Sequence, residues 1–217
     1  MKKCIIIANG YAAKKSAITF LQRKGYSDII CADGGANSAF KIGIIPNCII
    51  GDLDSISPEV YKYFSKRTMV LKLKRQNDTD VEKALKYALK NKYDEAILLG
   101  VTGDRLDHSF CNLGIAIKYS DKIKIRIIHE KSLLDVYKGV ISLDTTPNET
   151  LSIYGIDDKT KITSVGLKYR LNNTTLPFGK KESTSNIALG SIVKLKIKHG
   201  KIFVIRNFQT LKHNGLF

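Results

Sequence analysis

Over its first 128 residues the chain alternates short apolar runs with stretches whose apolar residues recur at helical spacing. Most of the runs are continuously apolar, which is typical of strands covered on both faces in a parallel sheet. The pattern predicts strands at Cys4–Ala8, Asp28–Ala32, Cys48–Gly51, Met69–Leu73, Ala96–Gly100 and Ile123–Ile128.

The clearest predicted helix covers Asp80–Lys90. Thr79 and Glu82 form a capping-box pattern at its start. This helix has its apolar residues on one face, at Val81, Ala84, Leu85, Ala88 and Leu89. The alternation of strands and helices predicts an open, mainly parallel α/β sheet over residues 1–130.

After about residue 130 the pattern changes to short β-prone runs without a strong helical period. Turn residues separate these runs, for example Asn172-Asn173 and His199-Gly200. We therefore expect a smaller antiparallel β domain over residues 131–217. Its predicted strands are Leu133–Tyr137, Leu151–Tyr154, Gly166–Leu171, Ile192–Ile197 and Ile202–Ile205.

The composition is that of an ordinary globular protein, but the net charge of +16 in 217 residues requires an explanation. A nucleic-acid-binding protein carries such an excess, and so does an enzyme that binds polyanionic nucleotides. The lysines are scattered, and the densest cluster, Lys72–Arg75, contains only three basic residues. This distribution disfavours nucleic acid as the partner.

The N-terminus resembles an export signal, but its apolar run, Cys4–Ala8, has five residues, fewer than the roughly 7–15 that such a signal needs. No stretch approaches the roughly 18 apolar residues of a membrane span. The cysteines have no metal-type spacing, so we expect reduced core residues and a cytoplasmic protein that binds no membrane. They are Cys4, Cys31, Cys48 and Cys111.

Polar residues follow five of the predicted strands, and in open α/β sheets ligands bind beyond the carboxyl ends of the strands. Loops are polar in general, so one such segment carries little weight, but five together predict a single binding rim. The segments are Asn9-Gly10, Asp33-Gly34-Gly35, Asp52–Ser55, Gln76–Asp80 and Thr102–His108.

Three carboxylates on this rim, Asp52, Asp54 and Asp80, suggest a cation site. Two carboxylates about 4 Å apart repel by about 4 kcal/mol at an effective dielectric near 20, and a divalent cation reverses that sign. Oxygen ligands without a His or Cys cluster favour Mg²⁺. The alternative is turn chemistry at Asp52 and Asp54, because aspartate favours turns.

The segment Asp78-Thr79-Asp80 also has a structural interpretation, as the cap of the following helix. We assign Thr79 to capping and Asp80 to the metal, and leave Asp78 open. Gly34 and Gly35 begin a predicted helix where a phosphate can approach the backbone. The chain contains neither G-x-G-x-x-G after the first strand nor G-x-x-x-x-G-K-[ST] anywhere.

The loop Thr102–His108 combines several residue types that act in catalysis. Arg105 can bind phosphate as a planar fork. Asp107 can orient a substrate hydroxyl or a metal-bound water, whereas we expect His108 to be a structural hydrogen-bonding group. The same residues also occur in solvated loops, which is the alternative.

These motifs, in this order and spacing, resemble the thiamine pyrophosphokinase family over essentially the whole chain. The matching segments are Ala32–Asn37, Gly51–Ser55, Asp78–Asp80, Thr102–His108 with Asn112, Gly166–Tyr169 and Ser183–Asn186.

The resemblance implies an α/β catalytic domain, a β-rich thiamine-binding domain, and a homodimer with thiamine at the subunit interface. It implies transfer of the diphosphate of ATP to the thiamine hydroxyl, which gives thiamine diphosphate and AMP.

The resemblance also implies which residues form the site. The Mg²⁺ ligands match Asp52, Asp54 and Asp80. The expected catalytic residues are Asp54, Asp80, Arg105 and Asp107. We expect ATP at Asn9, Gly10, Asp33, Gly34, Gly35, Thr102 and Arg105. We expect thiamine at Gln76, Thr79, Asp107, Ser185, Asn186 and Phe203.

The chain departs from the family pattern in two ways. Asn77 stands where an acidic residue is common, and the chain has no Trp to cover the thiamine pyrimidine. Phe203 is therefore the candidate for that stacking role. Two alternatives remain: a related diphosphotransferase acting on another alcohol, such as a pterin, and a basic nucleic-acid-binding module. The second gives no reason for carboxylates gathered on the binding rim.

Overall fold

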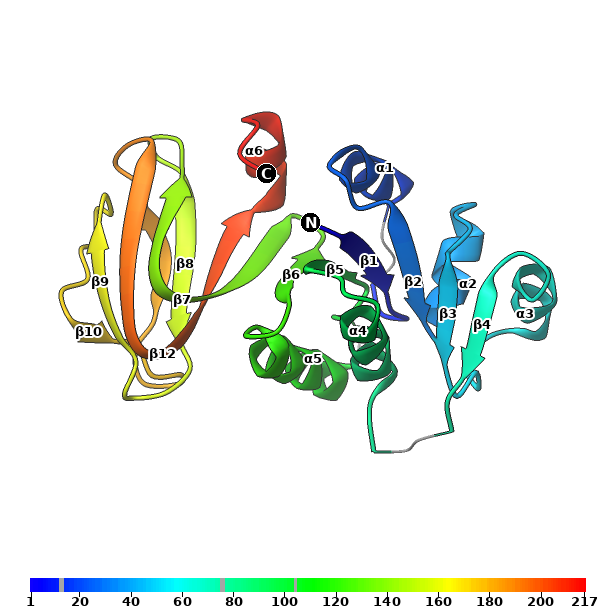
Figure 1. Ribbon diagram of the computed structural model, residues 1–217. Coiled ribbons are helices and arrows are strands. Elements are labelled where there is room, and N and C mark those ends of the chain that lie inside the picture. The colour runs from blue at the N-terminus through cyan, green and yellow to red at the C-terminus, as the bar shows by residue number, and fades with distance from the viewer. Residues whose placement is uncertain (12–13, 75–76, 104) are drawn as a thin grey trace. The chain divides into compact units, whose positions relative to one another are not determined.

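The structure is a computed structural model that describes residues 1–11, 14–74, 77–103 and 105–217 (Figure 1). It contains two compact units, Met1–Glu130 and Lys131–Phe217, each described here by itself. The first is built on parallel strands and the second on antiparallel strands. The predicted mixed α/β class is confirmed.

The first unit is a parallel sheet in the order β6-β5-β1-β2-β3-β4. Its strands are β1 (Lys3–Ile7), β2 (Asp28–Ala32), β3 (Cys48–Gly51), β4 (Met69–Lys72), β5 (Glu95–Leu99) and β6 (Lys124–His129). Its helices are α1 (Lys15–Arg23), α2 (Gly35–Lys41), α3 (Pro58–Phe64), α4 (Asp80–Lys90) and α5 (Leu106–Tyr119).

These strands agree with the apolar runs to within one residue at each end, because burial on both faces selects continuous apolar sequence. β3 and β5 are buried along their whole length. Right-handed crossovers place α1, α2 and α3 on one face of the sheet and α4 and α5 on the other (Figure 1).

β1 and β5 are neighbours at the point where the strand order reverses. The chain leaves β1 toward β2 on one side and leaves β5 toward β6 on the other. The loops beyond their carboxyl ends therefore diverge and open a crevice, which is where ligands bind in folds of this kind.

The second unit is antiparallel, and β12 is its central strand, paired with β7, β8 and β9. β10 extends it beyond β9, and β11 pairs with β8. The elements are β7 (Ser132–Asp144), β8 (Thr150–Gly155), β9 (Lys161–Val165), β10 (Thr174–Thr175), β11 (Ser183–Ile187), β12 (Ile192–Asn207) and α6 (Phe208–His213).

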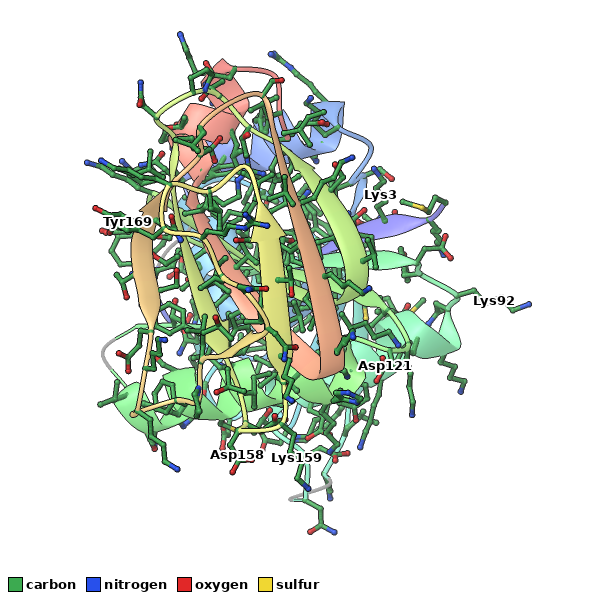
Figure 2. The ribbon with its side chains drawn as sticks, turned by 90° about the vertical axis from the view of Figure 1, so that its left-hand side faces the viewer. Lys3, Lys92, Asp121, Asp158, Lys159 and Tyr169 are labelled. Carbon is green, nitrogen blue, oxygen red and sulfur yellow. The ribbon has the colours of Figure 1, made fainter. Side chains whose placement is uncertain are left out.

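Alternate residues of these strands form one apolar core, with Leu195 and Ile202 of β12 fully buried. Apolar side chains also remain on the surface, including Tyr169, which is 60% exposed and is labelled in Figure 2. The tip of the loop between β8 and β9, at Asp158 and Lys159, is labelled in the same view.

The second unit differs from the predictions in several details: β9, β10 and β11 were not predicted, and β7 is longer than its predicted segment. The strand predicted at Gly166–Leu171 is wrong: β9 ends at Val165, and Gly166 leaves it with φ of 87°. The predicted turn at His199-Gly200 lies inside β12, where a positive φ at His199 and a register shift bend one continuous strand. Helix α6 was not predicted, because six residues are too few to show a period.

The capping box at α4 is only half formed. Thr79 Oγ1 accepts a bond from the backbone N–H of Glu82 at 3.3 Å, so Thr79 is the N-cap. The buried Glu82 carboxylate does not reach back, because it accepts bonds from Tyr119 Oη at 2.7 Å and Lys118 Nζ at 2.6 Å. Glu82 thus ties α4 to α5.

All four cysteines are free. Three are buried as predicted, but Cys111, on α5, is exposed, which corrects the prediction that it belongs to the core.

Candidate active site

A cleft of about 390 Å³ opens at the carboxyl ends of β1, β2 and β5, at the crevice where the strand order reverses. It lies within the first unit. Its walls are Ala8, Asn9, Gly10, Ala32, Asp33, Gly34, Ser55, Thr79, Asp80, Val81, Gly100, Val101, Thr102, Gly103, Arg105, His108 and Asn112.

Asp33 follows β2 directly and is only 3% exposed. Its backbone has φ of 42°, a left-handed conformation that costs free energy for a residue other than glycine. Its Oδ2 accepts a bond from the backbone N–H of Ser55 at 3.2 Å, whereas its Oδ1 is buried without a partner among the described residues. Buried polar oxygens are normally paired, so this oxygen is available to a ligand.

Asp52 and Asp54 lie in the tight loop after β3. Leu53 between them has φ of 67°, an unusual conformation for a bulky side chain. Asn37 of α2 holds the loop through its side chain, which donates to Ser55 O at 2.8 Å and accepts from Ser57 N–H at 3.1 Å. The Asn37 side chain therefore fixes the end of this loop through two hydrogen bonds.

Asp80 is the first residue of α4, positioned by the Thr79 cap. Gly51, at the end of β3, allows it to approach Asp33. A Cβ at Gly51 would lie 2.7 Å from Asp33 Cβ and 3.1 Å from Asp80 Oδ1. Only glycine leaves room for both carboxylates at this place.

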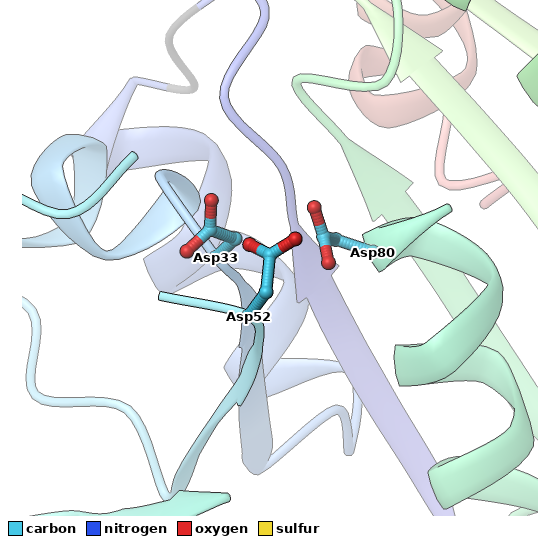
Figure 3. Close-up of side chains that lie close together, drawn as sticks. All are labelled: Asp33, Asp52 and Asp80. Atoms are coloured by element: carbon cyan, nitrogen blue, oxygen red, sulfur yellow. The ribbon is translucent and has the colours of Figure 1, made fainter. Parts of the chain in front are cut away.

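One carboxylate oxygen from each of Asp33, Asp52 and Asp80 lies within 4.8 Å of the others, and Figure 3 shows the three side chains converging. Three oxygen ligands at this spacing, one of them buried and unpartnered, fit a hard divalent cation. Asp54 is not in this group. It is exposed, and its Oδ1 accepts a bond from Ser55 Oγ at 2.9 Å.

The crowding of carboxylates changes the proton affinity of the most buried one. Burial raises the pKa of Asp33 above its ordinary value, bonds from Ser55 lower it, and the charges of Asp80 and Asp52 raise it. The net effect is upward, so the ionised form is destabilised until a cation compensates it.

One neighbour of the carboxylate group, Lys83, was not predicted from the sequence. Lys83 Nζ lies 2.8 Å from Asp80 Oδ1 and 3.9 Å from Asp52 Oδ2. Asp78, which the sequence left open, forms an ion pair with Lys86 at 2.6 Å and stays outside the group.

Arg105 and Asp107 pair with each other at the rim. Arg105 Nε donates to Asp107 Oδ1 at 3.1 Å and Nη2 to Oδ2 at 2.5 Å, and both side chains are 64% exposed. These bonds lower the pKa of Asp107 to about 2. Asp107 is consequently a weak base at neutral pH, which favours orientation of a hydroxyl over its deprotonation.

The loop after β5 is tied to its surroundings near its start, at Val101 and Thr102. The buried Asn112 of α5 donates from Nδ2 to Val101 O at 2.6 Å. Thr102 Oγ1 lies 2.7 Å from His129 Nδ1, and the His129 ring packs against Tyr11 with centroids 5.3 Å apart. His129 and Tyr11 stand far from the loop in sequence, so no local motif signalled their contact.

Most of the residues expected to bind ATP line the cleft: Asn9, Gly10, Asp33, Gly34, Thr102 and Arg105. Gly35 is not a wall residue. It begins α2, and a Cβ there would collide with the carbonyl oxygen of Ile7, so its small size serves close packing of helix on strand. Gln76 lies outside the described residues.

Of the other residues expected to bind thiamine, Thr79 and Asp107 belong to the first unit, and the remaining three belong to the second. Ser185 lies exposed on β11 with φ of 53°. Asn186 is 1% exposed, and its amide bonds to both the N–H and the carbonyl of Tyr169. It therefore holds the Tyr169 segment in place. Phe203 is half-buried on β12, beside Val136 and Tyr154.

A cleft at the switch point of a parallel sheet, with convergent carboxylates and a glycine-lined wall, defines the class of α/β proteins that bind phosphorylated ligands. Comparison of the sequence with known protein families narrows this class. The family model "Thiamin pyrophosphokinase, catalytic domain" matches residues 23–128, and "Thiamin pyrophosphokinase, vitamin B1 binding domain" matches residues 138–202. The chain belongs to the thiamin pyrophosphokinase family.

Individual relatives agree with this assignment. Thiamin pyrophosphokinase 1 of Caenorhabditis elegans is 31% identical over 81% of this chain and 77% of its own length. Thiamine pyrophosphokinase of Bacillus subtilis is 29% identical over 95% and 99%. The crystal structure of the Bacillus subtilis protein superposes with a TM-score of 0.79 at 25% identity, over 95% of this chain and 99% of that one.

Among the described residues, every helix is too short or too polar to cross a membrane.

Proposed function

We propose that this protein transfers the diphosphate of ATP to the hydroxyl of thiamine and releases AMP. The observation that carries the proposal is the convergence of Asp33, Asp52 and Asp80 in the cleft, within the region that matches the family's catalytic domain. Carboxylates gathered where a polyanionic nucleotide binds repel its phosphates, and this repulsion is relieved when a cation binds between the carboxylates and the phosphates.

We propose that Mg²⁺ is this cation and that Asp33, Asp52 and Asp80 hold it, directly or through water. The unpartnered Oδ1 of Asp33 and the close approach of Asp33 and Asp80 over Gly51 support the assignment. When bound, the ion neutralises phosphate charge and aligns the transferred group. Asp54 remains a predicted ligand, and in the structure it lies exposed, outside the group of three.

We propose that ATP lies along Asn9, Gly10, Gly34 and Thr102, which line the cleft. Positioning and electrostatic stabilisation account for catalysis in such transfers. Arg105 contributes a positive charge near the phosphates, and Asp107 fixes the direction of its guanidinium. The thiamine hydroxyl attacks the β-phosphorus, and the bond from that phosphorus to the oxygen bridging the α- and β-phosphates breaks.

We further propose a homodimer in which the second unit contributes to the thiamine site through Ser185, Asn186 and Phe203. Large apolar side chains exposed on this unit support an interface: Tyr169 at 60%, Phe178 at 67% and Leu189 at 64%. Burial of such side chains on association is favourable. Sedimentation equilibrium of the purified protein tests the dimer, and a monomer at micromolar concentration contradicts it.

The activity is tested with purified protein, ATP, Mg²⁺ and thiamine, following AMP and thiamine diphosphate together. We expect both products in equal amounts, no AMP without thiamine, and no reaction in EDTA. Asp80→Asn should lose at least about a hundredfold in kcat, because it removes a cation ligand. Asp78→Asn is the matched control, since Asp78 pairs with Lys86 instead.

Two outcomes contradict the proposal in different ways. AMP release with a pterin alcohol but not with thiamine points to a related diphosphotransferase and leaves the cation site intact. Tight, steeply salt-dependent binding of nucleic acid without any diphosphate transfer points to a basic binding module.

A further inference from the structure

Helix α4 brings one basic side chain into the carboxylate group. Lys83 lies one turn after Asp80 on the same face of the helix, and its side chain is only 4% exposed. Its Nζ is 2.8 Å from Asp80 Oδ1 and 3.9 Å from Asp52 Oδ2. Among the described residues these two carboxylates are its ion-pair partners.

The next lysine on the helix shows how unusual this placement is. Lys86 is 44% exposed and pairs with Asp78 at 2.6 Å and with Glu82 at 3.8 Å, where water screens the charge. A buried ammonium is costly unless it is paired. The burial of Lys83 therefore depends on the negative charge of the carboxylate group.

We propose that Lys83 is an internal counter-cation of the metal site. It holds Asp80 and Asp52 in place when no divalent ion is bound, and it competes with that ion for Asp80 Oδ1. The inference rests on the magnesium site proposed above and assigns Lys83 a positioning role. Binding of free metal must release the Lys83 ammonium, whereas an incoming nucleotide brings phosphate charge that offsets the released cation. Lys83 thus favours the joint entry of metal and ATP over metal alone.

The first part of the test uses the metal-free protein. In EDTA, Lys83→Met should lower the melting temperature, because Met keeps the apolar stem but leaves the carboxylates without a cation. Adding Asp80→Asn to Lys83→Met should raise the melting temperature again, because it removes one of the repelling charges. Lys86→Met is the matched control on the same helix, and combining it with Asp80→Asn should give additive shifts. Additive shifts for the Lys83 and Asp80 pair overturn the counter-cation role.

The second part measures the affinity for Mn²⁺, a paramagnetic ion that accepts the same oxygen ligands, by electron paramagnetic resonance. Without nucleotide, Lys83→Met should bind Mn²⁺ about tenfold more tightly than wild type, since a competing charge is gone. With ATP present the gain should be smaller. Lys86→Met should stay within about twofold of wild type. A side chain with a purely structural role has no reason to tighten metal binding when it is removed.

The outcomes separate this inference from the proposed function. If wild type binds Mn²⁺ at a site lost in Asp80→Asn, but Lys83→Met binds it equally or more weakly, the competition is refuted and the metal site stands. If wild type binds no Mn²⁺ at this site, the metal assignment fails and the competition fails with it. Should Lys83→Met not fold, Lys83→Gln, which also removes the charge, is used for both measurements.

Discussion

The guanidinium of Arg105 holds the carboxylate of Asp107 through two hydrogen bonds, at 3.1 Å and 2.5 Å. This fork is the geometry in which arginine binds carboxylates and phosphates most strongly. The pair presents a fixed guanidinium at the rim of the cleft. It also keeps Asp107 ionised, because the bonds lower the pKa of its carboxyl to about 2.

The pair predicts how the reaction depends on pH. Because its folded-state pKa is depressed, Asp107 changes charge only as the pH falls below its ordinary range toward 2. Asp107→Asn should therefore lower kcat/KM by about tenfold to a hundredfold through misplacement of Arg105, without changing the shape of the profile between pH 5 and 9. The measurement is kcat/KM for thiamine against pH. If the substitution abolishes an acid limb seen in wild type, Asp107 acts as a base.

The close approach of the segments that follow β1 and β5 predicts a second effect of substitution. A Cβ at Gly10 would lie 2.5 Å from the carbonyl oxygens of Gly100 and Thr102. Gly10→Ala should destabilise the protein by about 1–3 kcal/mol and raise the KM for ATP, because the cleft wall must shift.

Gly114 provides the matched control for this substitution. It lies inside α5, and nothing lies within 4 Å of an added Cβ. Gly114→Ala should stabilise the protein by about 1 kcal/mol through helix propensity, a rise of roughly 2–4 °C in melting temperature. Equal effects of the two substitutions would show that the approach at Gly10 can relax.

The parallel sheet was predictable because burial on both faces leaves continuous apolar runs in the sequence. Cys48–Gly51 is an example, with the predicted and observed bounds identical. The binding rim was also predictable, because carboxyl ends of parallel strands meet at one edge. In the second unit the sequence pattern predicts the strands less well. Ser164 is fully buried on β9, and Leu171 donates its N–H to Ser164 Oγ at 2.8 Å, so a polar residue occupies a core position.

The membership of the carboxylate group was harder to predict than its location. Sequence spacing treats Asp52 and Asp54 alike, but the turn at Leu53 directs only Asp52 toward Asp33 and Asp80. Lys83 has the sequence context of a solvated helical lysine. Its contact with Asp80 is local, but its contact with Asp52 depends on the loop after β3, which lies about thirty residues earlier in the sequence.

The second unit offers a prediction about stability. Arg206 is 7% exposed, and its Nε and Nη2 donate to the two oxygens of Glu149 at 2.7 Å and 2.9 Å. Glu149→Ala should cost about 3–5 kcal/mol, because it leaves a buried charge unpaired. The double variant Glu149→Ala/Arg206→Met should be more stable than Glu149→Ala alone. Urea unfolding measures both, and a double variant less stable than the single one would contradict the pair's role.

We expect substitution of Asp33 to have opposite effects on the stability of the metal-free protein and on its activity. Its carboxyl is buried near two like charges, and its pKa is raised. For an acid with a raised folded-state pKa, stability falls as the pH rises from its ordinary pKa through the raised one. Asp33→Asn removes this penalty while Asn Oδ1 can still accept the Ser55 bond. The metal-free variant should therefore be more stable at pH 7 by about 1 kcal/mol, or roughly 2–4 °C in melting temperature.

The same substitution should lower kcat by at least about a hundredfold and abolish most of the stabilisation by Mg²⁺ with ATP, since a ligand oxygen is lost. Thermal unfolding at pH 4 and pH 7, each with and without Mg²⁺ and ATP, provides the measurement. Asp54→Asn is the control in the metal-free protein, where its exposed position predicts a shift near zero. The gain of Asp33→Asn should shrink at pH 4, where Asp33 of the folded wild type is already protonated in part. If Asp33→Asn were less stable than wild type by the same amount at both pH values, the Asp33 side chain would stabilise the cleft floor. The repulsion between Asp33 and its neighbouring carboxylates would then be too small to affect stability.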